Sequence, residues 1–280
     1  MIETKNLTKK FDSFTAVDSL DLRIETGEFF GLLGPNGAGK TTTISLLSTL
    51  LLPTAGEILI NGQTLGRNRP DLKRKISVIT QEYSMRQDIN MDEIMEYQGR
   101  LYFMPRKEIK EKTEELLDFC GLLPFRKRTV RKLSGGMKRK LMVCRALLTS
   151  PEILLLDEPT AGMDALSRRQ MWNLLRQLNG KNLTILLTTH YMEEAQSLCN
   201  RVALMDHGKL EEINTPSGLI ESLGKYTVDQ ETPEGPKSHY FHSRADAIAF
   251  LSSLDGQCTL RETTLEDVFV ERAGRHLMQR

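Results

Sequence analysis

The chain has 280 residues, which is enough for one large domain or for one domain with an appended segment. Hydrophobic residues make up 39% of it and charged residues 27%, a balance that allows a sizeable core beneath a hydrated surface. The formal net charge of +1 gives no electrostatic reason to expect nucleic acid or an acidic substrate as a partner.

The first eighty residues contain strand patterns around a glycine-rich segment. Short apolar runs and partial alternation predict strands over residues 17–24, 29–33, 56–60 and 76–79. A helix is expected over residues 41–52, where Pro53 would end it. Asn61-Gly62 predicts a tight turn after the third of these strands.

Residues 85–150 differ from the rest because charged helical patterns dominate them and strand signals disappear. One helix is predicted from Arg106 to Cys120, and Gly121 suits its end. Another begins after Ser134, a suitable N-cap. We therefore expect an inserted helical subdomain, in which Lys138-Arg139-Lys140 forms a solvated helix face.

Beyond residue 150, strand and helix patterns alternate, which predicts a parallel sheet covered on both faces. Strands are expected over residues 153–156, 184–188 and 202–205, and helices over 166–178 and 192–199. A polar stretch rich in glycine and proline, 224–237, is expected to mark a boundary. After it we expect a helix over 244–254 and a second helix opened by Thr263 and Glu266 at capping-box spacing.

Cysteines and apolar runs limit where the chain can work. Cys120, Cys144, Cys199 and Cys258 have neither a zinc spacing nor that of a disulfide framework, so buried thiols in a reducing compartment are expected. The first ten residues include three lysines and no apolar run, and do not predict a secretory leader. Apolar runs such as Ile153–Leu156 are far shorter than the ~18–20 residues that span a bilayer.

Residues 34–41 match the phosphate-binding pattern G-x-x-x-x-G-K-[ST] at every fixed position. Its glycines let backbone N–H groups turn toward phosphates, and the following helix directs its positive end at them. Lys40 is expected to reach the β- and γ-phosphates, and the Thr41 hydroxyl to bind Mg²⁺. The nucleotide-binding residues expected here are Gly34, Pro35, Asn36, Gly37, Ala38, Gly39, Lys40, Thr41 and Thr42.

Two carboxylates follow the apolar run 153–156. A buried carboxylate needs a partner, and for Asp157 we expect Mg²⁺ through water. Strand alternation points Glu158 in a different direction from Asp157. Glu158 is therefore the candidate general base that polarises an attacking water.

Leu133-Ser134-Gly135-Gly136-Met137 places a hydroxyl and backbone N–H groups at a predicted helix N-terminus, which suits a second anion site. One chain does not need two such sites for one phosphate group. The order of phosphate loop, Leu-Ser-Gly-Gly and acidic strand end resembles the ATP-binding subunits of ABC transporters over roughly residues 1–220. That resemblance implies that Ser134, Gly135 and Gly136 bind the γ-phosphate held by an opposite subunit, in a head-to-tail dimer.

The same resemblance assigns three more residues. His190 is implied to contact the γ-phosphate, Gln81 to sense Mg²⁺ and water, and Phe11 to stack on adenine where tyrosine is commoner. From the residues alone, a core role for Phe11, a structural role for His190 and an ordinary loop role for Gln81 stay open. Met137 replaces the usual glutamine, as in the drug- and lipid-exporting branch of the family.

Residues 264–271 resemble the C-terminal segment of ATPases that serve ABC-2-type exporters, with a plain amphipathic helix as the alternative. The implied fold is an α/β P-loop NTPase core with a mostly parallel sheet over residues 1–223, and a small α+β extension over 224–280. The implied cofactors are ATP and Mg²⁺. The implied partners are a transmembrane permease on a separate chain and a second ATPase subunit, in a homodimer or heterodimer. The chain would lie in the cytoplasm, at the inner face of the membrane.

Two rival interpretations are weaker. ABC ATPases of DNA repair or translation carry a long coiled coil between the motifs or have two cassettes, whereas here about a hundred residues separate Gly34 from Ser134. A small-molecule kinase would use the phosphate loop but would not need Ser134-Gly135-Gly136. Transfer of the phosphoryl group to an acceptor would support a kinase.

Overall fold

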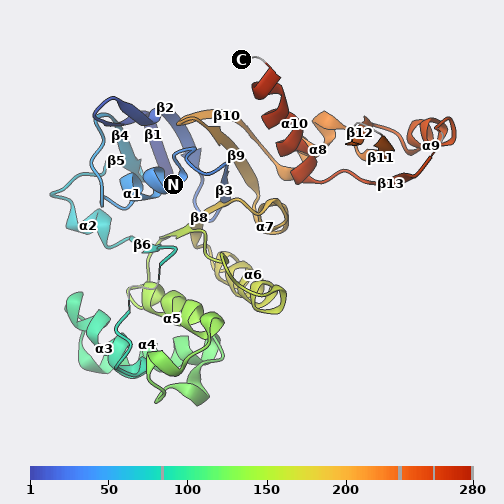
Figure 1. Ribbon diagram of the computed structural model, residues 1–280. Helices are drawn as coiled ribbons and strands as arrows, with labels where there is room; N and C mark the ends of the chain where they lie inside the picture. Colours follow the sequence, from blue (N-terminus) through green and yellow to red (C-terminus); the bar gives the residue numbers. More distant parts are fainter. Residues whose placement is uncertain (83–84, 233–234, 255, 279–280) are drawn as a thin grey trace. The chain divides into compact units, whose positions relative to one another are not determined.

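The computed structural model describes residues 1–82, 85–232, 235–254 and 256–278 (Figure 1). It divides into two units, one of Met1–His190 with Ala203–Glu212 and one of Tyr191–Val202 with Ile213–Arg280. Among the described residues, no helix has both the length and the apolar composition that a membrane crossing requires.

A six-stranded sheet is central to the first unit, with the strand order β10-β9-β3-β8-β7-β6. Its strands are β3 (Phe29–Leu33), β6 (Ile76–Ile79), β7 (Ile153–Asp157), β8 (Thr184–Thr189), β9 (Arg201–Asp206) and β10 (Lys209–Asn214). The neighbouring strands β3, β8, β7 and β6 pair in parallel. Every residue of β3, β7 and β8 is buried, as parallel strands covered on both faces require. The expected α/β fold with a mostly parallel sheet is confirmed.

A second, antiparallel sheet has the order β2-β1-β4-β5. It contains β1 (Ile2–Phe11), β2 (Phe14–Ile24), β4 (Ala55–Ile60) and β5 (Gln63–Thr64). The sequence did not predict β1, because threonine occupies a core position there. Thr4 is buried, and its hydroxyl donates to Leu20 O at 2.8 Å and accepts from Leu22 N–H at 3.0 Å. The turn predicted at Asn61-Gly62 is confirmed, since both residues have positive φ.

Three further helices belong to the first unit: α1 (Lys40–Leu47), α2 (Pro70–Lys73) and α6 (Ala165–Asn179). The expectation that α1 runs to residue 52 and ends at Pro53 is wrong. Ser48 already closes the helix, and Thr49 has the left-handed φ of 62°. The chain therefore turns away before the proline is reached.

The inserted region contains α3 (Met91–Leu101), α4 (Arg106–Phe119) and α5 (Gly135–Leu147), with short 3₁₀ turns η1 (Leu123–Phe125) and η2 (Val130–Lys132). Figure 1 shows the three α-helices grouped together beyond β6. α3 begins with a capping box in which Asn90 and Glu93 each accept from the other's backbone N–H. α3 and α4 come close at Gly99, where an added Cβ would lie 2.5 Å from Ile109.

The second unit contains α7 (Met192–Leu198), α8 (Pro216–Leu223), β11 (Tyr226–Thr232), β12 (Gly235–Phe241), α9 (Arg244–Ser252), β13 (Cys258–Glu262) and α10 (Leu265–Met278). Its strands form an antiparallel sheet in the order β12-β11-β13. Within the stretch expected to mark a boundary, residues 226–232 form β11 and residues 235–237 begin β12. Thr227 and Val228 of β11 are fully buried. A domain boundary at residue 224 stays a prediction, and in the structure α7 and α8 pack against α10 within this unit.

The cap of α10 differs from the predicted one by a single residue. Thr263 is buried, and its hydroxyl bonds that of Thr227 at 2.8 Å. Thr264 takes the capping position, where its N–H and hydroxyl both donate to Asp267, at 2.7 and 2.9 Å. Arg261 donates to the same carboxylate and to Asp229.

This ion-pair network shifts three pKa values. Burial raises the pKa of Asp267 and of Asp229, but the hydrogen bonds from Arg261, with those from Thr264 and Ser238, outweigh burial and hold both below their ordinary values. The same carboxylates raise the pKa of Arg261. Because the folded-state pKa of each carboxyl is depressed, its contribution is present above the unfolded value of about 3.8 and is lost as the pH falls further.

Arg261→Met should therefore weaken the second unit at pH 7 by about 2 kcal/mol, the scale of hydrogen bonds to charged groups. Hydrogen exchange of the β11 amides measures this stability. The difference between variant and wild type should shrink below pH 3.8, where the carboxyls become protonated. Arg244→Met, which removes an exposed cation from α9, is the matched control. An equal loss in both variants would contradict a role for the network.

Candidate active site

The carboxyl ends of four parallel strands meet at one edge of the central sheet. Gly34 follows β3 directly, Asp157 is the last residue of β7, and His190 follows β8. Gln81 comes two residues after β6. Parallel α/β sheets bind ligands at this edge, so the topology brings these predicted site residues to a common place.

The phosphate loop needs glycine at two positions for different reasons. A Cβ at Gly34 would lie 2.1 Å from Met205 O of β9, so the close approach of two backbones excludes a side chain. Gly37 has open space around it, but its φ is +84°, which other residues rarely adopt. The loop is thus shaped by a neighbouring strand at one end and by local conformation at its tip.

Lys40, at the start of α1, is only 6% exposed. Its Nζ donates to Gly34 O at 2.8 Å and to Pro35 O at 2.9 Å. Burial lowers the pKa of Lys40, while the carboxylates of Glu158 and Asp157 oppose that shift. The loop therefore encloses a cation that can exchange its carbonyl partners for the oxygens of an anion.

Asp157 is a buried carboxylate with two hydroxyl neighbours. Its Oδ1 accepts from the Thr188 hydroxyl at 2.6 Å and lies 3.2 Å from the Thr41 hydroxyl. These are oxygen donors of the kind that hard divalent cations prefer. The described residues contain no group of three or more His, Cys, Asp or Glu side chains that could hold a metal. A carboxylate beside two hydroxyls fits Mg²⁺, which uses one or two carboxylates and keeps several waters.

Glu158 has a left-handed backbone, with φ of 47°. Its N–H donates to Thr188 O at 3.0 Å, which holds the turn at the end of β7 against β8. Its Oε1 lies 3.1 Å from His190 Nδ1. The carboxylate is 13% exposed and the imidazole 40%, so this pair sits at the rim of the site, where water can reach it.

Phe11 and Gln81 are both exposed. Phe11 ends β1 and is 43% exposed, so the core role left open from the sequence does not apply. It pairs across the β1–β2 turn with Phe14, a second exposed aromatic that sequence reasoning missed. The Lys9 ammonium lies 5.0 Å from the centre of the Phe11 ring.

Ser134 is the N-cap of α5, and its hydroxyl accepts from Met137 N–H at 3.2 Å. Gly135 and Gly136 form the first turn of the same helix. Figure 1 shows α5 well apart from α1, the helix that follows the phosphate loop. The structure therefore does not bring Ser134-Gly135-Gly136 to the phosphate loop of its own chain.

Arg139 contradicts the prediction of a solvated basic face. It is 1% exposed, and its guanidinium donates to Thr80 O at 2.9 Å and to Gln81 O at 3.0 Å. A signal was available in the sequence, since Met142 and Val143, three and four residues further along, are buried on the same side of α5. Because Lys138-Arg139-Lys140 consists only of basic residues, the position of Arg139 on the buried face of the helix was overlooked.

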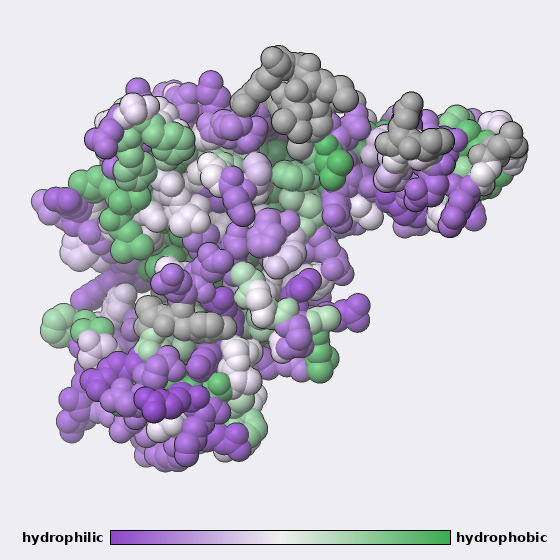
Figure 2. All heavy atoms as spheres, viewed as in Figure 1, coloured by the Kyte–Doolittle hydropathy of each residue, from purple (hydrophilic) through white to green (hydrophobic). Residues whose placement is uncertain are grey.

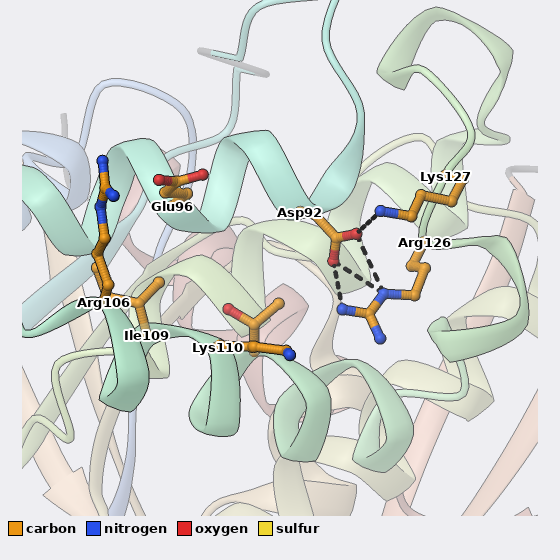
Figure 3. Close-up of a pocket in the computed structure, with 8 residues that line it drawn as sticks. Asp92, Glu96, Arg106, Ile109, Lys110, Arg126 and Lys127 are labelled. Carbon is orange, nitrogen blue, oxygen red and sulfur yellow. Dashed lines mark hydrogen bonds and ion pairs between the residues drawn. The ribbon is translucent and has the colours of Figure 1, made fainter.

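A polar cavity of about 430 Å³ lies between α3 and α4 (Figure 3). Asp92 points into it and pairs with Arg126 and Lys127, at 2.9 and 2.8 Å. Figure 2 shows mostly hydrophilic residues on the visible surface of this helical region. The residues that line this cavity include none of the predicted site residues, so the candidate active site is identified by the strand ends and not by this cavity.

The two loop glycines give a matched test. Gly34→Ala should lower the free energy of unfolding by about 3 kcal/mol and abolish ATP binding, because its methyl group cannot fit against Met205 O. Gly37→Ala should lose only about 1–2 kcal/mol, the value of an unfavourable left-handed backbone. Urea unfolding and calorimetry measure both quantities. Equal stability of the two variants would contradict the crowding at Gly34.

Comparison with known proteins agrees with this geometry. The family model described as "ABC transporter" matches residues 17–161, a span that includes the phosphate loop, Ser134-Gly135-Gly136 and the Asp157-Glu158 pair. The linearmycin resistance ATP-binding protein LnrL of Bacillus subtilis (strain 168) is 37% identical, over 84% of this chain and 76% of the relative. The Nod factor export ATP-binding protein I of Cupriavidus metallidurans is 35% identical over 99% of this chain and 98% of the relative.

A solved structure also resembles most of the chain. The dimeric ATP-binding cassette MJ0796, in a post-hydrolysis state with ADP and phosphate, superposes with a TM-score of 0.68 at 27% identity. The match covers 77% of this chain and 98% of that one. With the phosphate loop, the buried carboxylate and the Leu-Ser-Gly-Gly helix in place, the chain belongs to the ABC transporter family, as an ATP-binding and ATP-hydrolysing subunit.

Proposed function

We propose that this chain powers an ABC-2-type exporter whose permease is a separate membrane protein. The observation that carries the catalytic part is the sheet edge where Asp157, Glu158 and His190, at the ends of adjoining strands, meet the start of α1 with Lys40 and Thr41. The export assignment is supported by relatives named for drug resistance and for Nod factor export. The second of these covers 99% of this chain, so the C-terminal extension is largely included in the likeness.

Within the site, each residue has a distinct proposed role. Lys40 and the loop N–H groups of residues 34–42 bind the phosphates, and Phe11 stacks on the adenine. Thr41, Asp157 and Gln81 would hold Mg²⁺, which neutralises phosphate charge when bound. Asp157 is pre-set for this by its hydroxyl neighbours.

Glu158 is the proposed general base. Its carboxylate accepts a proton from the attacking water, and the imidazole of His190, 3.1 Å away, restrains it and contacts the γ-phosphate. The position of the pair at the rim of the site admits water, which hydrolysis needs and a kinase excludes. Inorganic phosphate as the product, in place of a phosphorylated acceptor, distinguishes the two.

Dimerisation accounts for the second anion site. Since Ser134-Gly135-Gly136 lies away from the phosphate loop of its own chain, we assign it to the nucleotide of an opposite subunit, in a homodimer or heterodimer. The dimeric state of MJ0796 with ADP and phosphate supports this arrangement. ATP binding would then join two subunits and hydrolysis would separate them. That movement would drive the permease from the cytoplasmic face of the membrane, without nucleic acid as a partner.

Glu158→Gln tests the catalytic assignment. The amide cannot take up the proton from water, so hydrolysis should fall about 10²–10⁴-fold while ATP binding is retained. MgATP should then hold a dimer, which size exclusion detects. His207→Gln removes an exposed imidazole from the β9–β10 turn and is the control. A Glu158→Gln chain that stays monomeric and hydrolyses at the wild-type rate would refute the assignment.

Ser134→Arg tests the shared site. A bulky cation there should block closure of the dimer, so hydrolysis falls while each chain still binds ATP. In a mixture with Lys40→Ala, one composite site carries both lesions and the other carries neither, so some hydrolysis should return. Calorimetry and phosphate release give the two readouts. Loss of ATP binding by a folded Ser134→Arg chain would place Ser134 in the same site as Lys40 and contradict the dimer.

A further inference from the structure

Arg139 is a charged side chain that the interior of the first unit fully encloses. Burying a guanidinium is unfavourable unless its donors are satisfied. Here the two terminal nitrogens donate to consecutive carbonyls, Thr80 O at 2.9 Å and Gln81 O at 3.0 Å. Such charge-assisted hydrogen bonds are about twice as strong as neutral ones, so this contact fixes both partners firmly.

The contact joins two motifs that the sequence separates by more than fifty residues. Arg139 lies on α5, the helix that begins at Ser134. Its partners lie just after β6, at the sheet edge that forms the site. A second bond ties the far end of α5 to the same strand, since the Ser77 hydroxyl donates to Ala146 O at 2.8 Å. A displacement of α5 must therefore move the Gln81 backbone or break the Arg139 bonds.

We propose that Arg139 is a positioning residue. It couples the position of Gln81 to that of Ser134-Gly135-Gly136, so that a movement of one moves the other. The inference rests on the proposed function, in which Ser134 receives the nucleotide of the opposite subunit and Gln81 serves the nucleotide of its own chain. Arg139 touches neither nucleotide. Its part is to let the arrival of one subunit align the glutamine of the other.

The guanidinium suits this task because of its shape. Its planar fork presents parallel N–H groups to two acceptors, whereas a lysine ammonium is a point charge. The chain bends at Gln81, and the Thr80 hydroxyl donates to Glu82 O at 3.2 Å, which orders that bend. Two successive carbonyls are thereby directed at one side chain, an arrangement that an extended strand does not give.

The test uses the full chain with Arg139→Met, Gln81→Ala and the double variant. Lys140→Met is the matched control, because Lys140 lies on the same helix but bonds Gln170 instead. Arg139→Met should lower kcat by about 10–10²-fold, as expected for a misplaced group, and leave the Kd for MgATP within about threefold. The double variant should hydrolyse no more slowly than Gln81→Ala alone, since both changes remove one function. Three results would overturn the proposal. These are a double variant whose loss of kcat is the sum of the two single losses, an unchanged kcat in Arg139→Met, and an unchanged kcat in Gln81→Ala.

Hydrogen exchange separates failure of this proposal from failure of the proposed function. The peptide covering residues 78–82 should exchange faster in Arg139→Met than in wild type or Lys140→Met, whether or not ATP is hydrolysed. Unchanged exchange would overturn the proposal that Arg139 holds the backbone at Thr80 and Gln81. If exchange is faster in Arg139→Met but the wild-type chain has no ATPase activity, only the proposed function is contradicted. If Arg139→Met does not fold, Arg139→Gln keeps two amide donors for the carbonyls and replaces it. That variant should still lower kcat relative to wild type, because its shorter side chain cannot reproduce both bonds, and a folded Arg139→Gln chain with the wild-type kcat would also overturn the proposal.

Discussion

Parallel pairing of β3, β8 and β7 is the constraint on which the rest of the site depends. Parallel strands end at the same edge, so residues 34, 157 and 190, far apart in the sequence, become neighbours without any contact that selects them individually. The hydrogen bonds between Thr41, Asp157 and Thr188 then lock three of these segments together. A change that shifted the register of β7 by one residue would turn Asp157 to the opposite face and dissolve the arrangement.

Three buried charged side chains near this edge of the sheet show how the interior of the first unit accommodates charge. Lys40 is held by carbonyls of its own loop, Asp157 by hydroxyls, and Arg139 by carbonyls after β6. Because backbone carbonyls are present in every sequence, they offer the buried cations of Lys40 and Arg139 acceptors within the fold itself.

Much of this could be predicted from the sequence, because the decisive features are local. The phosphate loop, the strand ending at Asp157 and the cap at Ser134 are each contained in fewer than ten residues, and turn chemistry fixed Asn61-Gly62. The failures came where a distant partner satisfied a polar side chain. Thr4 can occupy a core position because its hydroxyl bonds the backbone of Leu20 and Leu22. Arg139 can be buried because its guanidinium donates to the carbonyls of Thr80 and Gln81. Hydropathy patterns do not detect such compensation, so β1 and the burial of Arg139 on α5 were missed.

The backbone of Glu158 has an implication for how this protein can change. Its left-handed conformation is unfavourable for a residue with a Cβ, and glycine or asparagine would adopt it more easily. The position therefore carries strain that glycine or asparagine would relieve, by about 1–2 kcal/mol. The fold therefore gives up stability at a position where the proposed chemistry needs a carboxylate.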